Sequence, residues 1–149
     1  LNNKIYDLMH DLSLQVIKDG EGVSKLIIVN VSNARTKNQA KKIAFSIANS
    51  PLVKTAIAGE DANWGRVIMA IGKTKENINQ NNIKVLFGNN IVCENGSMSK
   101  KINTKNLDQY MKNKTIEINL KLNSGKFYHT VYGNDLTHEY LKINADYRS

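Results

Sequence analysis

The stretch SPLVKTAIAGEDANWGR, residues 50–66, contains the only proline and the only tryptophan of the 149-residue chain. Pro51 cannot continue the helical pattern that precedes it. Gly59 and Gly65 allow turns, or a close approach of the backbone to another group. The stretch is therefore expected to be loop-like, and its concentration of unusual residues is typical of a site.

The polar residues of this stretch have two interpretations. Asp61, Asn63 and Arg66 lie beside the large ring of Trp64, which suits a ligand site. Alternatively, Asp61 and Asn63 cap a helix over residues 64–71, with Trp64 in the core. Composition alone favours the capping interpretation, and both remain open at this point.

The flanking patterns predict a strand followed by a helix. Residues 3–17 have apolar residues at helical spacing, which predicts an amphipathic helix. Residues 24–33 are β-branched and apolar at consecutive positions, as in a strand covered on both faces. Thr36 is a suitable N-cap for a helix that continues to residue 50. Residues 73–82 are polar and rich in asparagine, so a surface loop or a hairpin connection is expected there.

The sequence of the second half of the chain predicts short strands and one helix. Strands are predicted at residues 83–87 and 90–93, and a short helix at 104–112. Residues 115–122 alternate apolar and polar side chains, and the NSG turn suggests that they pair with 126–132 as a hairpin. The expected fold is α/β, with mixed α+β layers in one region that covers residues 1–149.

Composition excludes several classes of protein. A single cysteine, Cys93, excludes an internal disulfide, and Cys93 is expected to be a buried or half-buried residue of a strand. His129 and His138 lack the spacing of metal ligands, so no metal is expected. The net charge of +8 invites a nucleic-acid hypothesis, but the lysines are scattered and no nucleic-acid-binding motif is present. A basic binding module without catalysis is kept as an alternative.

Two further features concern the compartment and the start of the chain. No run approaches the roughly 18 apolar residues of a membrane span, and no signal-peptide pattern opens the chain. We therefore expect no membrane contact and a cytoplasmic location. The chain opens with Leu1 instead of methionine, so a processed product or a fragment of a longer protein is expected.

Three separated stretches resemble the ornithine acetyltransferase family, the bifunctional glutamate N-acetyltransferases of arginine biosynthesis. The first motif is DGEGVSK, residues 19–25; the central motif is residues 50–66; the terminal motif is DLTHEYLKINADYRS, residues 135–149. The small departures are at Val23, Ser24, Ala62 and Ser149, where the family more often has Ala, Thr, Pro and Thr. The resemblance implies a fold similar to the N-terminal-nucleophile-like sandwich, and the C-terminal part of a β chain.

The resemblance also implies substrate-binding residues. Glu21, Asn144 and Ser149 match positions that bind the amino-acid substrate in the family, and the Thr-to-Ser change at the last position keeps the hydroxyl. Asp61, Asn63 and Arg66 are expected to shape the site or support it. The catalytic residue implied by the family is a threonine upstream of Leu1, so no catalytic residue is expected in this chain, which alone should be inactive.

The implied reaction moves the acetyl group of N-acetylornithine to glutamate through an acyl-threonine enzyme and releases ornithine. Some members of the family also accept acetyl-coenzyme A as the donor, and no cofactor is implied. The implied partners are the upstream α chain and the remainder of the β chain, in a heterotetramer of two α and two β chains. A self-processing aminopeptidase of the same fold is the alternative enzyme class.

Overall fold

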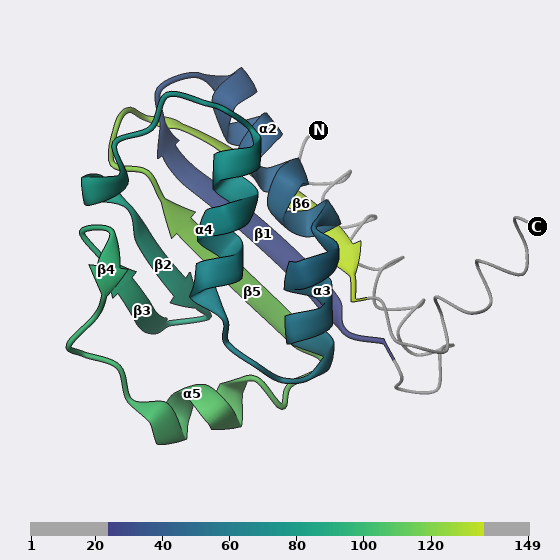
Figure 1. The fold of residues 1–149 in the computed structure, drawn as a ribbon. Helices are drawn as coiled ribbons and strands as arrows, with labels where there is room; N and C mark the ends of the chain where they lie inside the picture. Colours follow the sequence, from purple (N-terminus) through teal and green to yellow (C-terminus); the bar gives the residue numbers. More distant parts are fainter. Residues whose placement is uncertain (1–23, 136–149) are drawn as a thin grey trace, which may run out of the picture.

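The computed structural model describes residues 24–135 as a mixed six-stranded sheet with three helices packed on one face. The strand order is β4-β3-β2-β5-β1-β6. Strand β1 (Leu26–Ala34) pairs parallel with β5 (Thr115–Lys121) and antiparallel with β6 (Phe127–Asn134). Figure 1 shows β1 running between the two later strands. The α/β prediction for this part of the chain is confirmed.

The predicted hairpin between residues 115–122 and 126–132 is wrong, although both strands exist. The link between β5 and β6 crosses the end of β1: Ser124 and Gly125 both donate backbone hydrogen bonds to the Asn33 carbonyl, at 2.9 and 3.0 Å. One face of β1 is apolar and lies in the core, whereas the other carries Asn30 and Ser32 after its first residues, and a neighbouring strand pairs with β1 on each side. Alternation along a strand identifies its buried face but says nothing about its neighbour.

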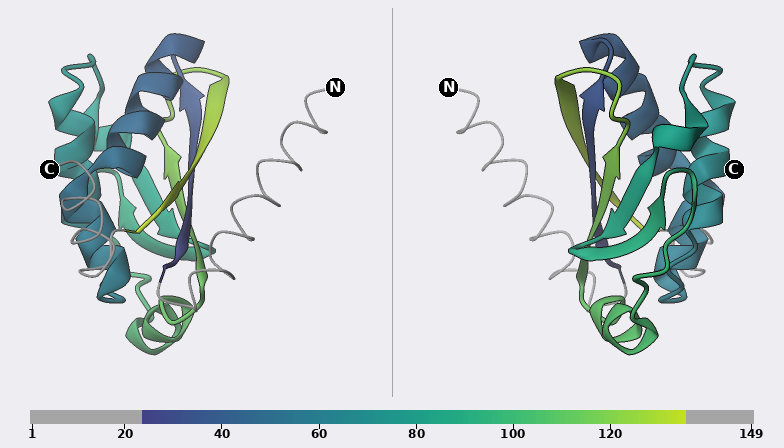
Figure 2. Two further views of the ribbon diagram at one scale, coloured as in Figure 1. Left: turned by 90° about the vertical axis from the view of Figure 1, so that its right-hand side faces the viewer. Right: turned by 90° about the vertical axis from the view of Figure 1, so that its left-hand side faces the viewer.

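The helical layer consists of α2 (Lys37–Asn49), α3 (Pro51–Ala58) and α4 (Trp64–Lys73). Figure 2 shows these helices on the same side of the sheet. Thr36 caps α2 as predicted, because its side chain accepts a hydrogen bond from the backbone N–H of Gln39 at 3.0 Å.

The expectation of a loop throughout residues 50–66 is wrong, because its first half is helix α3. Pro51 does end the preceding helix, but it also occupies the first turn of the next one. Proline suits that position because its missing N–H would have no helical partner there. The Ser50 side chain caps the new helix by accepting the Val53 N–H at 3.3 Å.

The remaining elements follow the predicted order. They are the 3-10 turn η1 (Gln80–Asn82), β2 (Lys84–Phe87), β3 (Asn90–Glu94), β4 (Ser97–Met98) and α5 (Thr104–Tyr110). The short turn η1 and the two-residue strand β4 were not predicted, and both residues of β4 are exposed. The Asn95–Gly96 turn before it has positive φ at both residues, which suits a tight hairpin.

The core lies between the sheet and the helical layer. It is built from alternate residues of the central strands and from the inner stripes of the helices, and includes Ile27, Val29, Ile118, Leu120, Ile43, Ile47, Ile57 and Val67. Cys93 is fully buried as expected, and burial raises the pKa of its thiol above the ordinary value. Among the described residues, no helix has the length and apolarity needed to cross a bilayer.

Candidate functional site

The second half of the central motif forms the turn between α3 and α4. Glu60 has a φ of 58°, in the left-handed region that often follows a helix end. The next residue, Asp61, donates its backbone N–H to the Ala56 carbonyl at 2.8 Å, which closes the turn. Both acidic side chains are exposed, so the turn presents two carboxylates at the surface.

The side chains of Asn63 and Arg66 form hydrogen bonds with backbone groups of the protein itself. The Asn63 side chain caps α4 by accepting the Arg66 backbone N–H at 3.2 Å, and its amide lies 3.4 Å from an Asp61 carboxylate oxygen. The Arg66 guanidinium donates to the Leu52 carbonyl at 2.8 Å and so connects α4 with the start of α3. The capping interpretation is therefore confirmed for Asn63. The side chain of Trp64 is partly buried and packs against the core.

A dense polar contact lies where β1 begins. The Lys25 ammonium donates to Glu60 Oε2 at 2.9 Å, to the Met111 carbonyl at 2.9 Å and to the Asn113 carbonyl at 2.7 Å. Only 12% of the Lys25 side chain is exposed, against 44% for Glu60. The three protons of the ammonium thus have three acceptors, two of them in the turn that follows α5.

The backbone of Lys25 is bound equally closely. Its N–H donates to the Asp135 carboxylate, and its carbonyl accepts the Asp135 N–H at 3.0 Å. Asp135 is only 1% exposed, and its second carboxylate oxygen has no hydrogen-bond partner within the part of the chain that the structure describes. Burial raises the pKa of Asp135, and the neighbouring charges of Lys25 and Lys54 oppose that rise.

This contact joins the described ends of all three motifs. Lys25 is the last residue of the first motif, Glu60 belongs to the central motif, and Asp135 is the first residue of the terminal motif. We call these three residues the Lys25 node. The predicted substrate-binding residues Glu21, Asn144 and Ser149 lie outside the described residues. The contacts of Lys25 with the other two motifs could not be predicted from the positions of the motifs in the sequence.

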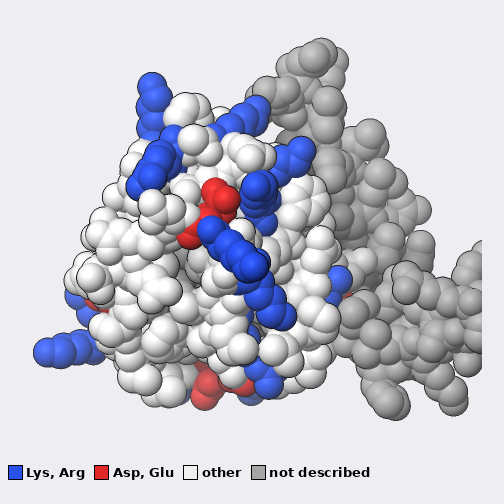
Figure 3. Space-filling view, turned by 45° about the horizontal axis from the view of Figure 1, so that its top comes forward, with Lys and Arg blue, Asp and Glu red and all other residues white. Residues whose placement is uncertain are grey.

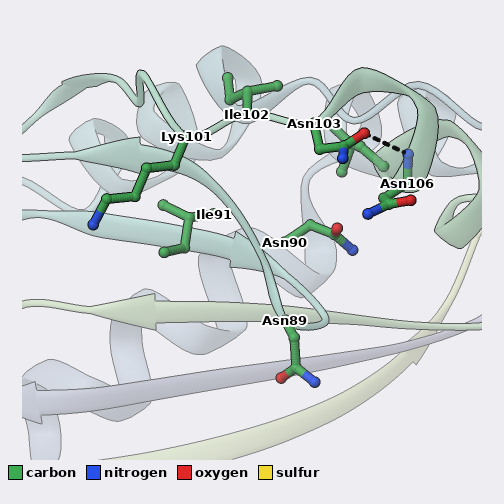
Figure 4. A pocket seen from close by; sticks show the side chains of 8 residues that line it. Asn89, Asn90, Ile91, Lys101, Ile102, Asn103 and Asn106 are labelled. Atoms are coloured by element: carbon green, nitrogen blue, oxygen red, sulfur yellow. Dashed lines mark hydrogen bonds between the residues drawn. The ribbon is translucent and has the colours of Figure 1, made fainter.

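Two cavities lie away from the node. The smaller, of about 220 Å³, is enclosed by the β2–β3 turn and the start of α5. Figure 4 shows its asparagine side chains, with Asn103 bonded to the backbone of Asn106 at 3.1 Å as the cap of α5. Part of its polar lining is thus used by the fold, and no pattern in the sequence predicted this cavity.

The larger cavity, of about 630 Å³, is an open groove along α2. Lys41, Lys42 and Phe45 line it together with Lys73. Figure 3 shows that basic side chains gather on this side of the molecule with acidic ones among them. Burial, Lys41 and a neighbouring lysine lower the pKa of His129. No group of three or more histidine, cysteine, aspartate or glutamate residues within residues 24–135 is arranged to hold a metal.

Comparison with known proteins identifies the family. Residues 1–149 match the ArgJ family model over their whole length. The chain belongs to the ArgJ family, which confirms the resemblance carried by the three motifs. The arginine biosynthesis bifunctional protein ArgJ of Bartonella quintana is 51% identical over 144 residues, which cover 95% of this chain and 34% of that protein. For ArgJ of Rhizobium meliloti the identity is 48% over 143 residues, covering 96% and 35%.

A solved structure agrees with the fold. The crystal structure of the arginine biosynthesis bifunctional protein ArgJ from Bacillus halodurans has a TM-score of 0.83 and 36% sequence identity. The match covers 97% of this chain and 68% of the crystallised chain. This chain therefore has the fold of a family member, and it spans about a third of the length of the curated relatives.

Proposed function

We propose that this chain is the C-terminal, substrate-recognising part of the β chain of an ornithine acetyltransferase. The observation that carries the proposal is the match of the ArgJ family over residues 1–149. The relatives from Bartonella quintana and Rhizobium meliloti bear the name arginine biosynthesis bifunctional protein. In this proposal the nucleophile lies in the upstream part of the protein.

The proposed reaction has two steps. The hydroxyl of the upstream threonine attacks the acetyl carbonyl of N-acetylornithine, while the α-amine of that threonine takes the proton. The C–N bond breaks, ornithine leaves with the proton, and the acetyl group stays on the threonine oxygen. Glutamate then attacks this ester with its amine, which forms N-acetylglutamate and returns the proton to the threonine. Acetyl-coenzyme A is a second proposed donor.

The residues of this chain would select the amino acid. Glu21 pairs with a substrate ammonium, and Asn144 and Ser149 bind its polar α-substituents, because charge-assisted hydrogen bonds discriminate best among zwitterions. Asp61, Asn63 and Arg66 support the central motif from the protein side; their contacts give each of them a partner within the fold, and none requires a ligand. The proposed assembly is a cytoplasmic heterotetramer of two α and two β chains.

The test is acetyl transfer by the complete protein, with its upstream segment. We expect transfer from N-acetylornithine to glutamate in the wild type, and a Glu21→Gln variant with KM raised by roughly tenfold or more, since hydrogen bonds to charged groups are worth about 1.5–3 kcal/mol. Glu76→Gln is the matched control, because Glu76 lies outside the three motifs and, within residues 24–135, forms its ion pair with Lys42 at 3.8 Å. Absence of transfer by a folded, self-cleaved wild type would refute the proposal and direct the next assay to aminopeptidase substrates.

A further inference from the structure

Lys25 has an unusual set of contacts for a lysine at the start of a strand. All three acceptors of its ammonium come from other segments: one from the central motif and two from the turn that links α5 to β5. A lysine ammonium has three protons and no acceptor capacity. Lys25 therefore has no proton left to bind a ligand directly, and any role in recognition must act through the groups that it holds.

The groups held by Lys25 are distant in sequence. Glu60 is 35 residues away, the two carbonyls are 86 and 88 residues away, and Asp135 is 110 residues away. The Lys25 backbone extends the β1–β6 ladder by one position beyond the Leu26–Asn134 pair. Through its backbone and its side chain, Lys25 therefore connects both outer ends of the described chain with the α3–α4 turn.

The Lys25 node contains one positive side chain, Lys25, and two negative ones, Glu60 and Asp135. Two carboxylates, Glu60 and Asp135, flank the chain at Lys25, and only the Asp135 carboxylate is buried. A buried carboxylate is costly unless it is hydrogen-bonded and positive charge lies nearby. The charges of Lys25 and Lys54 supply it. Removal of the Lys25 charge would therefore weaken two links at once: the direct bond to Glu60, and the field that stabilises the Asp135 carboxylate.

We propose that Lys25 is a positioning residue for amino-acid recognition, which holds the described end of the first motif and the first residue of the terminal motif against the central motif, through Glu60 and Asp135. This inference rests on the proposed function, because it assigns the substrate groups to the motifs that Lys25 connects. Glu21 is four residues before Lys25 in the sequence, and Asn144 is nine residues after Asp135. Small displacements of binding groups reduce catalytic efficiency strongly, by up to about 100-fold for about 1 Å.

The experiment compares Lys25→Met with wild type in the complete protein. Methionine keeps an unbranched apolar stem and removes the ammonium. We expect KM for N-acetylornithine to rise by about tenfold while kcat changes by less than about threefold, because binding geometry is lost and the reacting groups lie elsewhere. The affinity for ornithine, measured by calorimetry, should fall in parallel. Lys112→Met is the matched control, since Lys112 is exposed and lies in the same turn, between Met111 and Asn113.

A second variant protects the test against a folding defect. Glu60→Ala removes the exposed partner of the ion pair and should leave the fold intact, because surface ion pairs contribute only about 0–1 kcal/mol. We expect it to raise KM in the same direction, by up to about fivefold. If Lys25→Met has a lower melting temperature but the same KM as the Lys112→Met control, the inference is overturned. If Lys25→Met does not fold, an unchanged KM in Glu60→Ala overturns it.

These outcomes separate the two proposals. Acetyl transfer by the wild type, together with unchanged KM values in both variants, refutes the positioning role and leaves the proposed function standing. Absence of transfer by a folded wild type refutes the proposed function, and the inference that rests on it falls too.

Discussion

Replacement of Asn63 by alanine tests whether this side chain supports the fold or the site. Its carboxamide oxygen accepts the Arg66 backbone N–H at 3.2 Å, and the weaker contact to Asp61 is 3.4 Å long and exposed. Loss of an N-cap costs about 1 kcal/mol, within a range of about 0.5–2 kcal/mol. The exposed contact to Asp61 adds little to that cost. Asn63→Ala should therefore destabilise α4 by about 1 kcal/mol.

Amide hydrogen exchange of the complete protein is the suitable assay, because it reports the opening of α4 itself. A cost of about 1 kcal/mol corresponds to roughly fivefold faster exchange in peptides that cover Trp64–Lys73, where opening limits exchange. Peptides from α5 serve as the internal reference. Asn63→Ser is the control variant, because a serine hydroxyl can also accept the N–H at this position.

Two results would contradict this reasoning. Unchanged exchange of α4 in Asn63→Ala would show that the cap contributes nothing. Equal acceleration in Asn63→Ser and Asn63→Ala would show that the lost group is not the cap acceptor. The same pair of variants also tests the ligand interpretation: if Asn63→Ser keeps the protection of α4 but loses acetyl transfer, the amide group serves the site.

Two further predictions concern the packing and the charge of the fold. A Cβ on Gly125 would lie 2.3 Å from the Ala34 carbonyl oxygen, so Gly125→Ala should lower the free energy of unfolding, measured in urea, by about 1–3 kcal/mol. A Cβ on Gly72 would have no atom within 4 Å, so Gly72→Ala should leave the free energy of unfolding unchanged or raise it. Equal effects of the two substitutions would contradict this reasoning. Burial and Lys41 lower the pKa of His129 below 6.5, so its contribution to stability is full above that pH and is lost as the pH falls through the folded pKa. Lys41→Met should raise the His129 pKa in an NMR titration; a fall, or no change, would refute the assigned cause.

Much of the fold could be predicted because the signals are local. The apolar run of β1, the Thr36 cap and the alternation of β5 each depend on neighbours within a few residues. The end of the preceding helix at Pro51 was predicted correctly, but the new helix that starts there was missed, since a proline that ends one helix also suits the first turn of another. The prediction of a β5–β6 hairpin was wrong for a different reason. Its turn residues and alternation are also compatible with a link that crosses the end of β1, and only long-range pairing decides between the two.

The candidate site shows the same limit. The Asn63 cap was predictable from the polar residue before a helical pattern, and the structure confirms it. The Lys25 node was not predictable, because its contacts join segments 35 to 110 residues apart and leave no periodic pattern in the sequence. Resemblance supplied the three motifs, and the structure supplied the residue that connects their described ends.

The position of β1 has a consequence for synthesis of the protein. Its side-chain contacts reach partners 87 residues later on β5 and 100 residues later on β6. At a translation rate of about 5–20 residues per second, an apolar strand leaves the ribosome roughly 5–20 s before either neighbour is made. During that interval both of its edges are open to pairing with other chains. Among the described segments, the helices that follow β1 directly are the first to be made that cover one of its faces.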